Sequence, residues 1–219
     1  MALWRREFLG LGLTLTALGG GQAGAASSSG EQPTNEPQDA WLDQGGRRHR
    51  IIFDTISIKG AGEALNFTDN FYIANQSGYG IAGKDLSVVI ILRHFSVVFG
   101  FNDAAWGKFG AALSDWGQLA ELGIKPATIN LYDASPLDPK LFSRGRKLSG
   151  VQGQGARFAV CEVASKAVAF MVSKATGADV NAVLEEMKAN LIPGAVMVPA
   201  GIVTLNRAQE RGYTACSCG

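Results

Sequence analysis

Cys161 lies where an apolar segment gives way to a predicted helix. The segment ARFAVC, residues 156–161, is typical of a strand, and EVASKAVAFMVSKATG continues as a helix ended by Gly177. A helix N-terminus presents unpaired N–H groups and a partial positive charge, which favour a thiolate over a thiol. Free cysteine is also among the residue types most often buried as a small hydrophobe. Cys161 is therefore either a reactive thiol or part of the core.

His94 is a second candidate, at the carboxyl end of another apolar run. It follows VVIIL within DLSVVIILRHF, residues 85–95, and is one of only two histidines in the chain. Ligands of open α/β sheets bind beyond the carboxyl ends of the strands, where Cys161 is also expected. An imidazole beside a thiol can accept or donate its proton. The alternative is a structural histidine whose hydrogen bonds are made within the core or at an edge of the sheet.

Other motifs give weaker signals. Cys216 and Cys218 form a C-x-C pair near the C-terminus; they are the closest pair for a disulfide, but neighbours this close rarely meet disulfide geometry. Two histidines and one C-x-C fall short of a zinc set. GVQGQG precedes a predicted strand, whereas phosphate-binding glycine loops follow one. We therefore expect no metal and no cofactor.

The composition is that of a globular domain. The chain has 219 residues, 47% of them hydrophobic, and a formal charge of +1 from 20 basic and 19 acidic residues. That length predicts one domain, or one domain with an appendage. The absence of a basic stripe interleaved with aromatic residues argues against nucleic-acid binding.

The N-terminus resembles a bacterial twin-arginine export signal. Arg5, Arg6, Phe8 and Leu9 fit R-R-x-F-L, and Ala23-Gly24-Ala25 fits a cleavage site. The apolar stretch is too short and too weak for a membrane span; a buried amphipathic helix or an uncleaved anchor is the alternative. We expect a signal peptide over 1–25, a polar linker over 26–48, a domain over 49–219 and a periplasmic location.

Strand and helix patterns alternate along 49–219. Strands are expected at 49–58, 85–95, 127–133, 156–161, 195–200 and 213–218. Helices are expected at 62–80, 102–123, 162–177, 180–191 and 201–212. The second of these helices is interrupted by Gly107, Gly110 and Gly117, and Asp179 caps the fourth. Residues 134–155 are expected to form a long loop. This alternation predicts the α/β class, with a mainly parallel sheet flanked by helices.

The C-terminal third resembles the DsrE/DsrF-like (YchN-like) family. The resemblance covers about 49–219 and is most specific over 156–213. It rests on a strand ending in a cysteine, an L-P-G-like segment, a V-x-P-[SA]-G strand end, an L-x-x-x-Q helix, a G-Y pair and an upstream strand ending in histidine. These are Cys161, Leu191 to Gly194, Val198 to Gly201, Leu205 to Gln209, Gly212-Tyr213 and His94.

The resemblance implies a Rossmann-like subunit that forms trimers or hexamers. Sulfur-relay members of the family carry sulfur as a persulfide on the cysteine that matches Cys161. One interpretation is thus a periplasmic persulfide carrier in which His94 tunes Cys161, with a sulfur donor or acceptor protein as partner and the C-x-C pair in a resolving or relay role. Because a carrier exchanges thiol for persulfide, turnover need not occur. The other interpretation is a non-enzymatic oligomeric binding or assembly module with Cys161 as packing.

Overall fold

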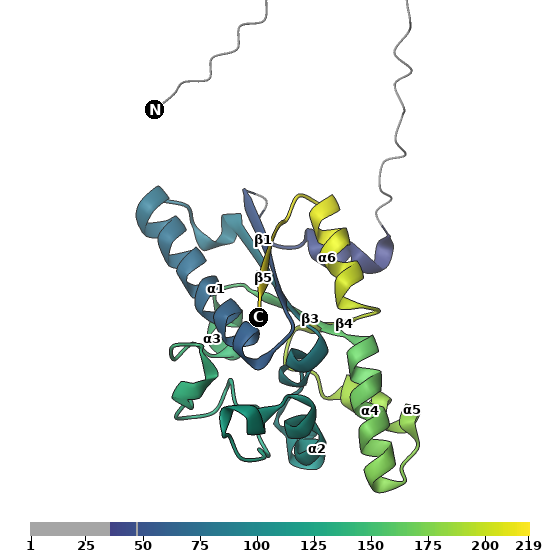
Figure 1. Cartoon of the computed structure of the whole chain (residues 1–219). Helices are drawn as coiled ribbons and strands as arrows, with labels where there is room; N and C mark the ends of the chain where they lie inside the picture. The colour runs from purple at the N-terminus through teal and green to yellow at the C-terminus, as the bar shows by residue number, and fades with distance from the viewer. Residues whose placement is uncertain (1–35, 47) are drawn as a thin grey trace, which may run out of the picture. The chain divides into compact units, whose positions relative to one another are not determined.

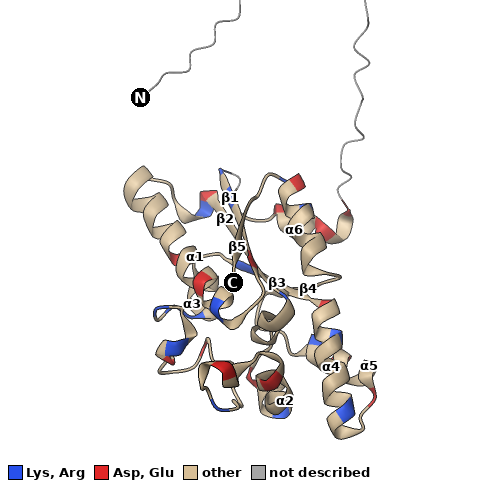
Figure 2. Ribbon diagram, in the orientation of Figure 1, with Lys and Arg blue, Asp and Glu red and all other residues tan. Residues whose placement is uncertain are grey.

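The computed structural model describes residues 36–46 and 48–219 (Figure 1). The predicted export signal and its cleavage site lie outside these residues. No helix in the described part of the chain is long and apolar enough to cross a bilayer. Acidic and basic residues are interspersed along the helices and loops (Figure 2).

The core is a five-stranded sheet in which every pair of neighbours is parallel. In spatial order its strands are β4 Ala195–Val198, β3 Arg157–Cys161, β2 Leu86–Leu92, β1 His49–Thr55 and β5 Thr214–Cys218. Every residue of β2 is buried, as its continuous apolar run requires of a strand covered on both faces. The predicted α/β class with a parallel sheet is confirmed.

Helices cover both faces of the sheet unequally. They are α1 Ile58–Tyr79, α2 Asp103–Trp116, α3 Leu148–Gly153, α4 Glu162–Thr176, α5 Val180–Ala189 and α6 Gly201–Glu210. Residues of α1 to α5 pack with Phe53, Ile90 and Val160 in the larger apolar core. Helix α6 packs with Ile52 and Ile91, which alternate with that set and so face the other way. Figure 1 shows α6 on the opposite side of the sheet from α4 and α5.

The strand predicted at 127–133 is wrong, because this segment is assigned to no strand and pairs with none of the strands among residues 36–46 and 48–219. Its side chains instead form hydrogen bonds with backbone carbonyls of other segments of the chain. The Asn130 amide donates to the carbonyls of Phe99 and Phe101, both at 2.9 Å. The buried Tyr132 hydroxyl lies 2.5 Å from the Ile58 carbonyl and 2.8 Å from that of Leu141. These contacts make the segment a buried connection rather than a strand.

Two other expectations need correction. The predicted loop 134–155 contains the 3-10 helix η5 Pro139–Leu141 and helix α3. Helix α2 runs through Gly107 and Gly110 without a break and ends before Gly117. A Cβ on Gly110 would lie 2.1 Å from the Ala127 carbonyl oxygen. This glycine therefore permits close backbone approach rather than ending the helix.

The predicted linker 26–48 is in part integral to the domain. Its 3-10 helix η1, Pro37–Asp43, places Leu42 fully inside the smaller core. The Tyr213 hydroxyl donates to the Leu42 carbonyl at 2.7 Å, and Arg157 donates to the carbonyl of Trp41. Because these contacts hold η1 against the sheet, the folded unit starts before the predicted boundary at residue 49.

Candidate functional site

Adjacent strands β3 and β4 lead into helices on opposite faces of the sheet. Strand β3 runs directly into α4, which joins the larger core, whereas β4 leads into α6, which joins the smaller one. Neighbouring connections that diverge in this way open a crevice beyond the strand ends, which is the usual ligand position in open α/β sheets. The sheet topology therefore points to the ends of β3 and β4.

A cavity of about 600 Å³ lies at this position. Both residues selected from the sequence, Cys161 and His94, line it together. Its full lining is Arg93, His94, Phe95, Trp116, Cys161, Val163, Ala164, Ala167, Ala200, Gly201 and Ile202. Apart from the Arg93 guanidinium, the His94 imidazole, the thiol and the Trp116 indole, these side chains are apolar, as in most small-molecule sites.

Cys161 occupies the N-cap position of α4, as predicted. Its backbone is extended, and its carbonyl accepts a hydrogen bond from the Ser165 hydroxyl at 2.8 Å. The residue is 6% exposed, so the thiol reaches its surroundings mainly through the cavity. The N-terminal end of α4 stabilises negative charge at this position.

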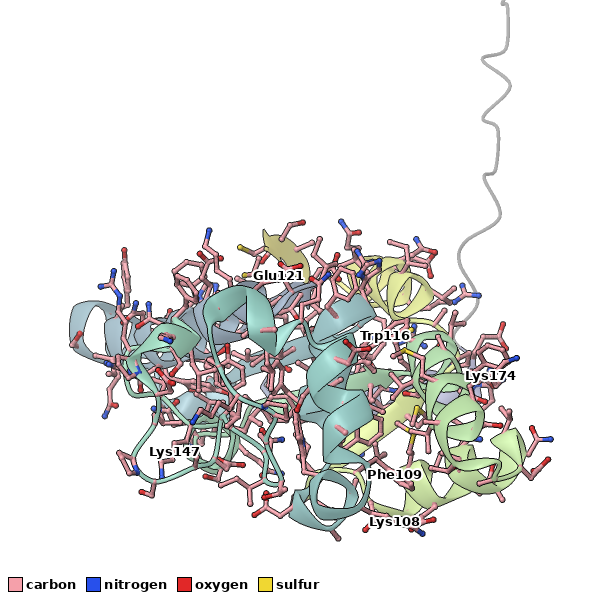
Figure 3. The ribbon with its side chains drawn as sticks, turned by 60° about the horizontal axis from the view of Figure 1, so that its bottom comes forward. Lys108, Phe109, Trp116, Glu121, Lys147 and Lys174 are labelled. Carbon is pink, nitrogen blue, oxygen red and sulfur yellow. The ribbon has the colours of Figure 1, made fainter. Side chains whose placement is uncertain are left out.

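His94 has a backbone conformation that is uncommon for a residue with a side chain. Its φ is +55°, in the left-handed region. The indole Nε1 of Trp116, the last residue of α2 (Figure 3), donates to the His94 carbonyl at 2.8 Å. The imidazole lies edge-on to the Phe95 ring at a centroid distance of 4.1 Å. Strained backbone of this kind concentrates at functional sites, where surrounding contacts maintain it.

Arg93 and Asp54 are residues of the site that the sequence analysis missed. The Arg93 Nε donates to Asp54 Oδ1 at 2.6 Å, and Nη2 donates to Oδ2 at 2.7 Å. The hydrogen bond to Asp54 raises the pKa of Arg93 against the effect of burial, and the negative charges of Asp54 and Cys161 raise it further. Asp54, near the end of β1, could have been found by the strand-end argument that selected His94.

Hydroxyl groups fix the turn that carries Arg93 and His94. Thr55 Oγ1 donates to the Ile91 carbonyl at 2.6 Å and lies 2.8 Å from Ser96 Oγ. Ser96 Oγ accepts from the Arg93 backbone N–H at 3.0 Å. Both hydroxyl side chains are fully buried. The turn after β2 is therefore tied to the end of β1, which holds Asp54.

The C-x-C pair lies away from this cavity. Cys218 ends β5, and β1 and β2 separate β5 from β3. Three strand spacings of about 4.8 Å put roughly 14 Å between the ends of β3 and β5. All three cysteines are free thiols. Direct sulfur transfer between Cys161 and the C-x-C pair within one chain therefore does not fit this arrangement.

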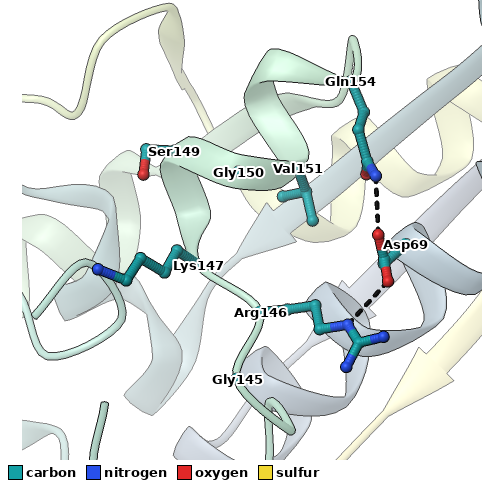
Figure 4. A pocket seen from close by; sticks show the side chains of 8 residues that line it. All are labelled: Asp69, Gly145, Arg146, Lys147, Ser149, Gly150, Val151 and Gln154. Atoms are coloured by element: carbon teal, nitrogen blue, oxygen red, sulfur yellow. Dashed lines mark hydrogen bonds and ion pairs between the residues drawn. The ribbon is translucent and has the colours of Figure 1, made fainter. Parts of the chain in front are cut away.

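A polar cleft of about 360 Å³ lies beside α1 and α3 (Figure 4). In it, Asp69 accepts hydrogen bonds from Arg146 Nε and Gln154 Nε2, each at 2.7 Å. Burial alone would raise the pKa of Asp69, but the bonds from Gln154 and Arg146 outweigh it and lower the pKa. Because its carboxylate is fully engaged, we assign this cluster to holding the loop and α3 against α1.

Residues 36–46 and 48–219 contain no group of three or more His, Cys, Asp or Glu side chains arranged to hold a metal ion. Comparisons of the chain with family models, with curated proteins and with solved structures find no match. The chemistry of the crevice is thus the main guide to function.

Proposed function

We propose that this chain is a sulfur carrier of the DsrE/DsrF-like type, in which Cys161 holds sulfane sulfur as a persulfide. The observation that carries the proposal is the shared position of Cys161 and His94 in one crevice where the connections after β3 and β4 diverge. Arg93 adds a cation to the same lining. A thiol, an imidazole and a guanidinium are thus brought together.

The exchange needs no group beyond these and the donor. The Cys161 thiolate attacks the outer sulfur of a donor persulfide, R–S–SH. A new S–S bond forms between Cys161 and this outer sulfur, the S–S bond of the donor breaks, and the donor leaves as a thiolate, RS⁻. His94 is placed to protonate that leaving group, and Arg93 to stabilise negative charge on sulfur. Cys161–S–SH then delivers its outer sulfur to an acceptor thiol by the same exchange.

The apolar walls suit a reactive intermediate. Ala164 and Ala167 offer no side-chain polar atom to hold water beside the sulfur, and Val163 and Ile202 form an apolar but exposed rim. Exclusion of water strengthens the electrostatic effect of Arg93 and protects a bound intermediate from side reactions. A carrier that must keep its sulfur between two partners benefits from both effects.

Exposed apolar side chains on α4 and α6, two of which line the crevice, support a homo-oligomer, a trimer or a hexamer, as the family resemblance implies. Val163 is 61% exposed, Phe170 52%, Ile202 57% and Val203 47%. Clustered exposed hydrophobes mark interaction surfaces. Light scattering at micromolar concentration tests this; a monomer would weaken both the oligomer and the family assignment.

A second function, an assembly or binding module with Cys161 as packing, is favoured by one observation. At 6% exposure, Cys161 is as enclosed as an ordinary core residue. Reactivity in the folded state separates the two functions, because a packed thiol reacts only on unfolding.

The test uses the full chain with Cys216→Ser and Cys218→Ser, so that Cys161 is the one remaining thiol. Iodoacetamide is applied at several pH values below the unfolding transition, and a polysulfide is applied separately. The carrier predicts alkylation of folded protein and a mass gain of one sulfur atom, both lost with Cys161→Ser. Labelling confined to unfolded protein would establish the packing role instead.

A further inference from the structure

Cys216 and Cys218 lie on one face of an edge strand. They are two residues apart in β5, so both side chains point to the same side of the sheet, toward the larger core. Alternate Cα atoms of a strand lie about 6.6 Å apart, so the two side chains are neighbours on that face. Among the strands that the structure describes, β5 pairs with β1 alone. The structure thus holds two free thiols side by side on one face of an edge strand.

The two thiols differ in accessibility. Cys216 is half-buried, whereas Cys218 is 3% exposed. Burial raises the pKa of Cys218 to about 12, with further contributions from Cys216, Glu63 and Asp54. An outer thiol that can meet a substrate is therefore paired with an inner thiol that stays protonated. This is the division between an attacking and a resolving cysteine.

There is room beside the inner thiol. A cavity of about 360 Å³ adjoins Cys218 and is also lined by Asp54, Ile56, Arg93, Ser217 and Gly219. It lies at the carboxyl ends of β1 and β5, and Arg93, which follows β2, lines both this cavity and the Cys161 crevice.

We propose that Cys216 and Cys218 form a dithiol centre that exchanges with disulfide substrates. The Cys216 thiolate attacks R–S–S–R; the substrate S–S bond breaks, which gives Cys216–S–S–R and RS⁻, and RS⁻ takes up the proton that Cys216 has lost. Cys218 then attacks the Cys216 sulfur and passes its proton to the second departing RS⁻; the bond between Cys216 and the substrate sulfur breaks, the Cys216–Cys218 disulfide closes, and a second RSH is released. The dithiol is oxidised by two electrons, the substrate disulfide is reduced, and each cysteine proton leaves on a released thiol.

The spacing of Cys216 and Cys218 along β5 also favours the dithiol over the disulfide. Alternate residues of a strand are about 6.6 Å apart at Cα, near the long limit of about 6.8 Å for a disulfide. Formation of the Cys216–Cys218 disulfide must therefore shorten the strand locally. This shortening disturbs fewer hydrogen bonds in an edge strand than in a central strand. A disulfide closed against this geometry is readily reduced, so the dithiol is the favoured form. A strongly oxidising substrate drives the exchange.

The probe is 4,4′-dithiodipyridine, supplied at one molecule per chain to the full-length protein with Cys161→Ser. The dithiol centre predicts two thiopyridones released per probe and a product lighter by two hydrogens, without an adduct. With Cys218→Ser added, we expect one thiopyridone and a stable adduct on Cys216. With Cys216→Ser instead, folded protein should not react. Circular dichroism checks that each variant is folded.

The proposal is overturned if the adduct persists on Cys216 with Cys218 present, if covalent dimers form, or if neither thiol reacts before unfolding. Peptide mapping of the unmutated chain after the same treatment gives a second reading should a variant fail to fold. None of these outcomes bears on persulfide formation at Cys161.

Discussion

Arg93 binds both carboxylate oxygens of Asp54 while its side chain lines the crevice that contains Cys161. The Asp54 side chain is 7% exposed and that of Arg93 26%. The guanidinium therefore connects a buried carboxylate at the end of β1 with the crevice at the end of β3. The pairing with Asp54 offsets part of the positive charge that Arg93 presents to the crevice.

Substitutions on the two sides of this pair should have opposite effects on Cys161. Arg93→Gln removes the cation, so alkylation of folded protein should slow several-fold. Asp54→Asn frees the cation from its partner, so alkylation should become faster. The rates are measured with Cys216→Ser and Cys218→Ser in place, and Lys174→Gln, an exposed change at the far end of α4, should leave them unchanged. Equal effects of both substitutions would contradict this electrostatic role.

Removing Arg93 and removing Asp54 should lower the free energy of unfolding by different amounts. Arg93→Gln leaves a buried carboxylate unpaired, and breaking a buried pair costs about 3 kcal/mol or more. Asp54→Asn leaves a cation that water partly reaches, so its cost should be smaller. Urea unfolding of both variants measures the difference, and a larger loss for Asp54→Asn would refute it.

Gly201→Ala should disturb the crevice directly. A Cβ at this position would lie 2.8 Å from Ile91 Cγ2 and 2.9 Å from Arg93 Cδ. Because the first contact is with a core side chain, we expect a loss of about 1–3 kcal/mol of stability and a changed Cys161 alkylation rate. Gly78→Ala in α1 is the matched control, since its Cβ would meet nothing within 4 Å. If both variants have the stability and the Cys161 alkylation rate of the unmodified protein, Gly201 does not shape the crevice.

Tyr132→Phe tests why residues 127–133 are not a strand. The substitution keeps the ring and deletes the hydroxyl near the Ile58 and Leu141 carbonyls. Loss of this buried bond should lower the free energy of unfolding by about 1–2 kcal/mol. Tyr79→Phe, at an exposed tyrosine, should change it little. Equal stabilities of the two variants would show that the hydroxyl does not hold the segment.

Alkaline pH should destabilise the fold through two buried acids. Burial raises the pKa of Cys218 to about 12, and that of Tyr72 also to about 12. The unfolded state loses these protons near pH ~8.5 and ~10, while the folded state keeps them. Stability is thus full below pH ~8.5 and falls toward pH 12, by up to ~1.4 kcal/mol per pH unit for each group. Urea midpoints between pH 8 and 11 measure this, and Cys218→Ala should flatten the first part of the decline. A stability that is constant over this range would contradict it.

The predicted export signal implies that the native protein has lost its first 25 residues. The twin arginine at Arg5 and Arg6 and the Ala23-Gly24-Ala25 site predict cleavage after Ala25. N-terminal sequencing of protein from the periplasmic fraction should start at Ala26, and Arg5→Lys with Arg6→Lys should abolish export. Full-length protein that begins at Met1 in the cytoplasmic fraction would refute the prediction.

The sequence by itself determined the parallel α/β architecture and the positions of Cys161 and His94 at strand ends. These features depend on local patterns, namely apolar runs, helix periodicity and caps such as Asp179. The carboxyl ends of parallel strands share one edge of the sheet, so candidate residues at those ends could be expected to lie on the same edge.

Only the tertiary structure decided which strand ends face one another. The strand order separates Cys161 from Cys218 by two intervening strands and puts α4 and α6 on opposite faces, which creates the crevice. It also joins Asp54 to Arg93, 39 residues apart, and Asn130 to Phe99, 31 residues apart. Such partners are chosen by packing between distant segments, and a local hydrophobic pattern carries no information about that choice.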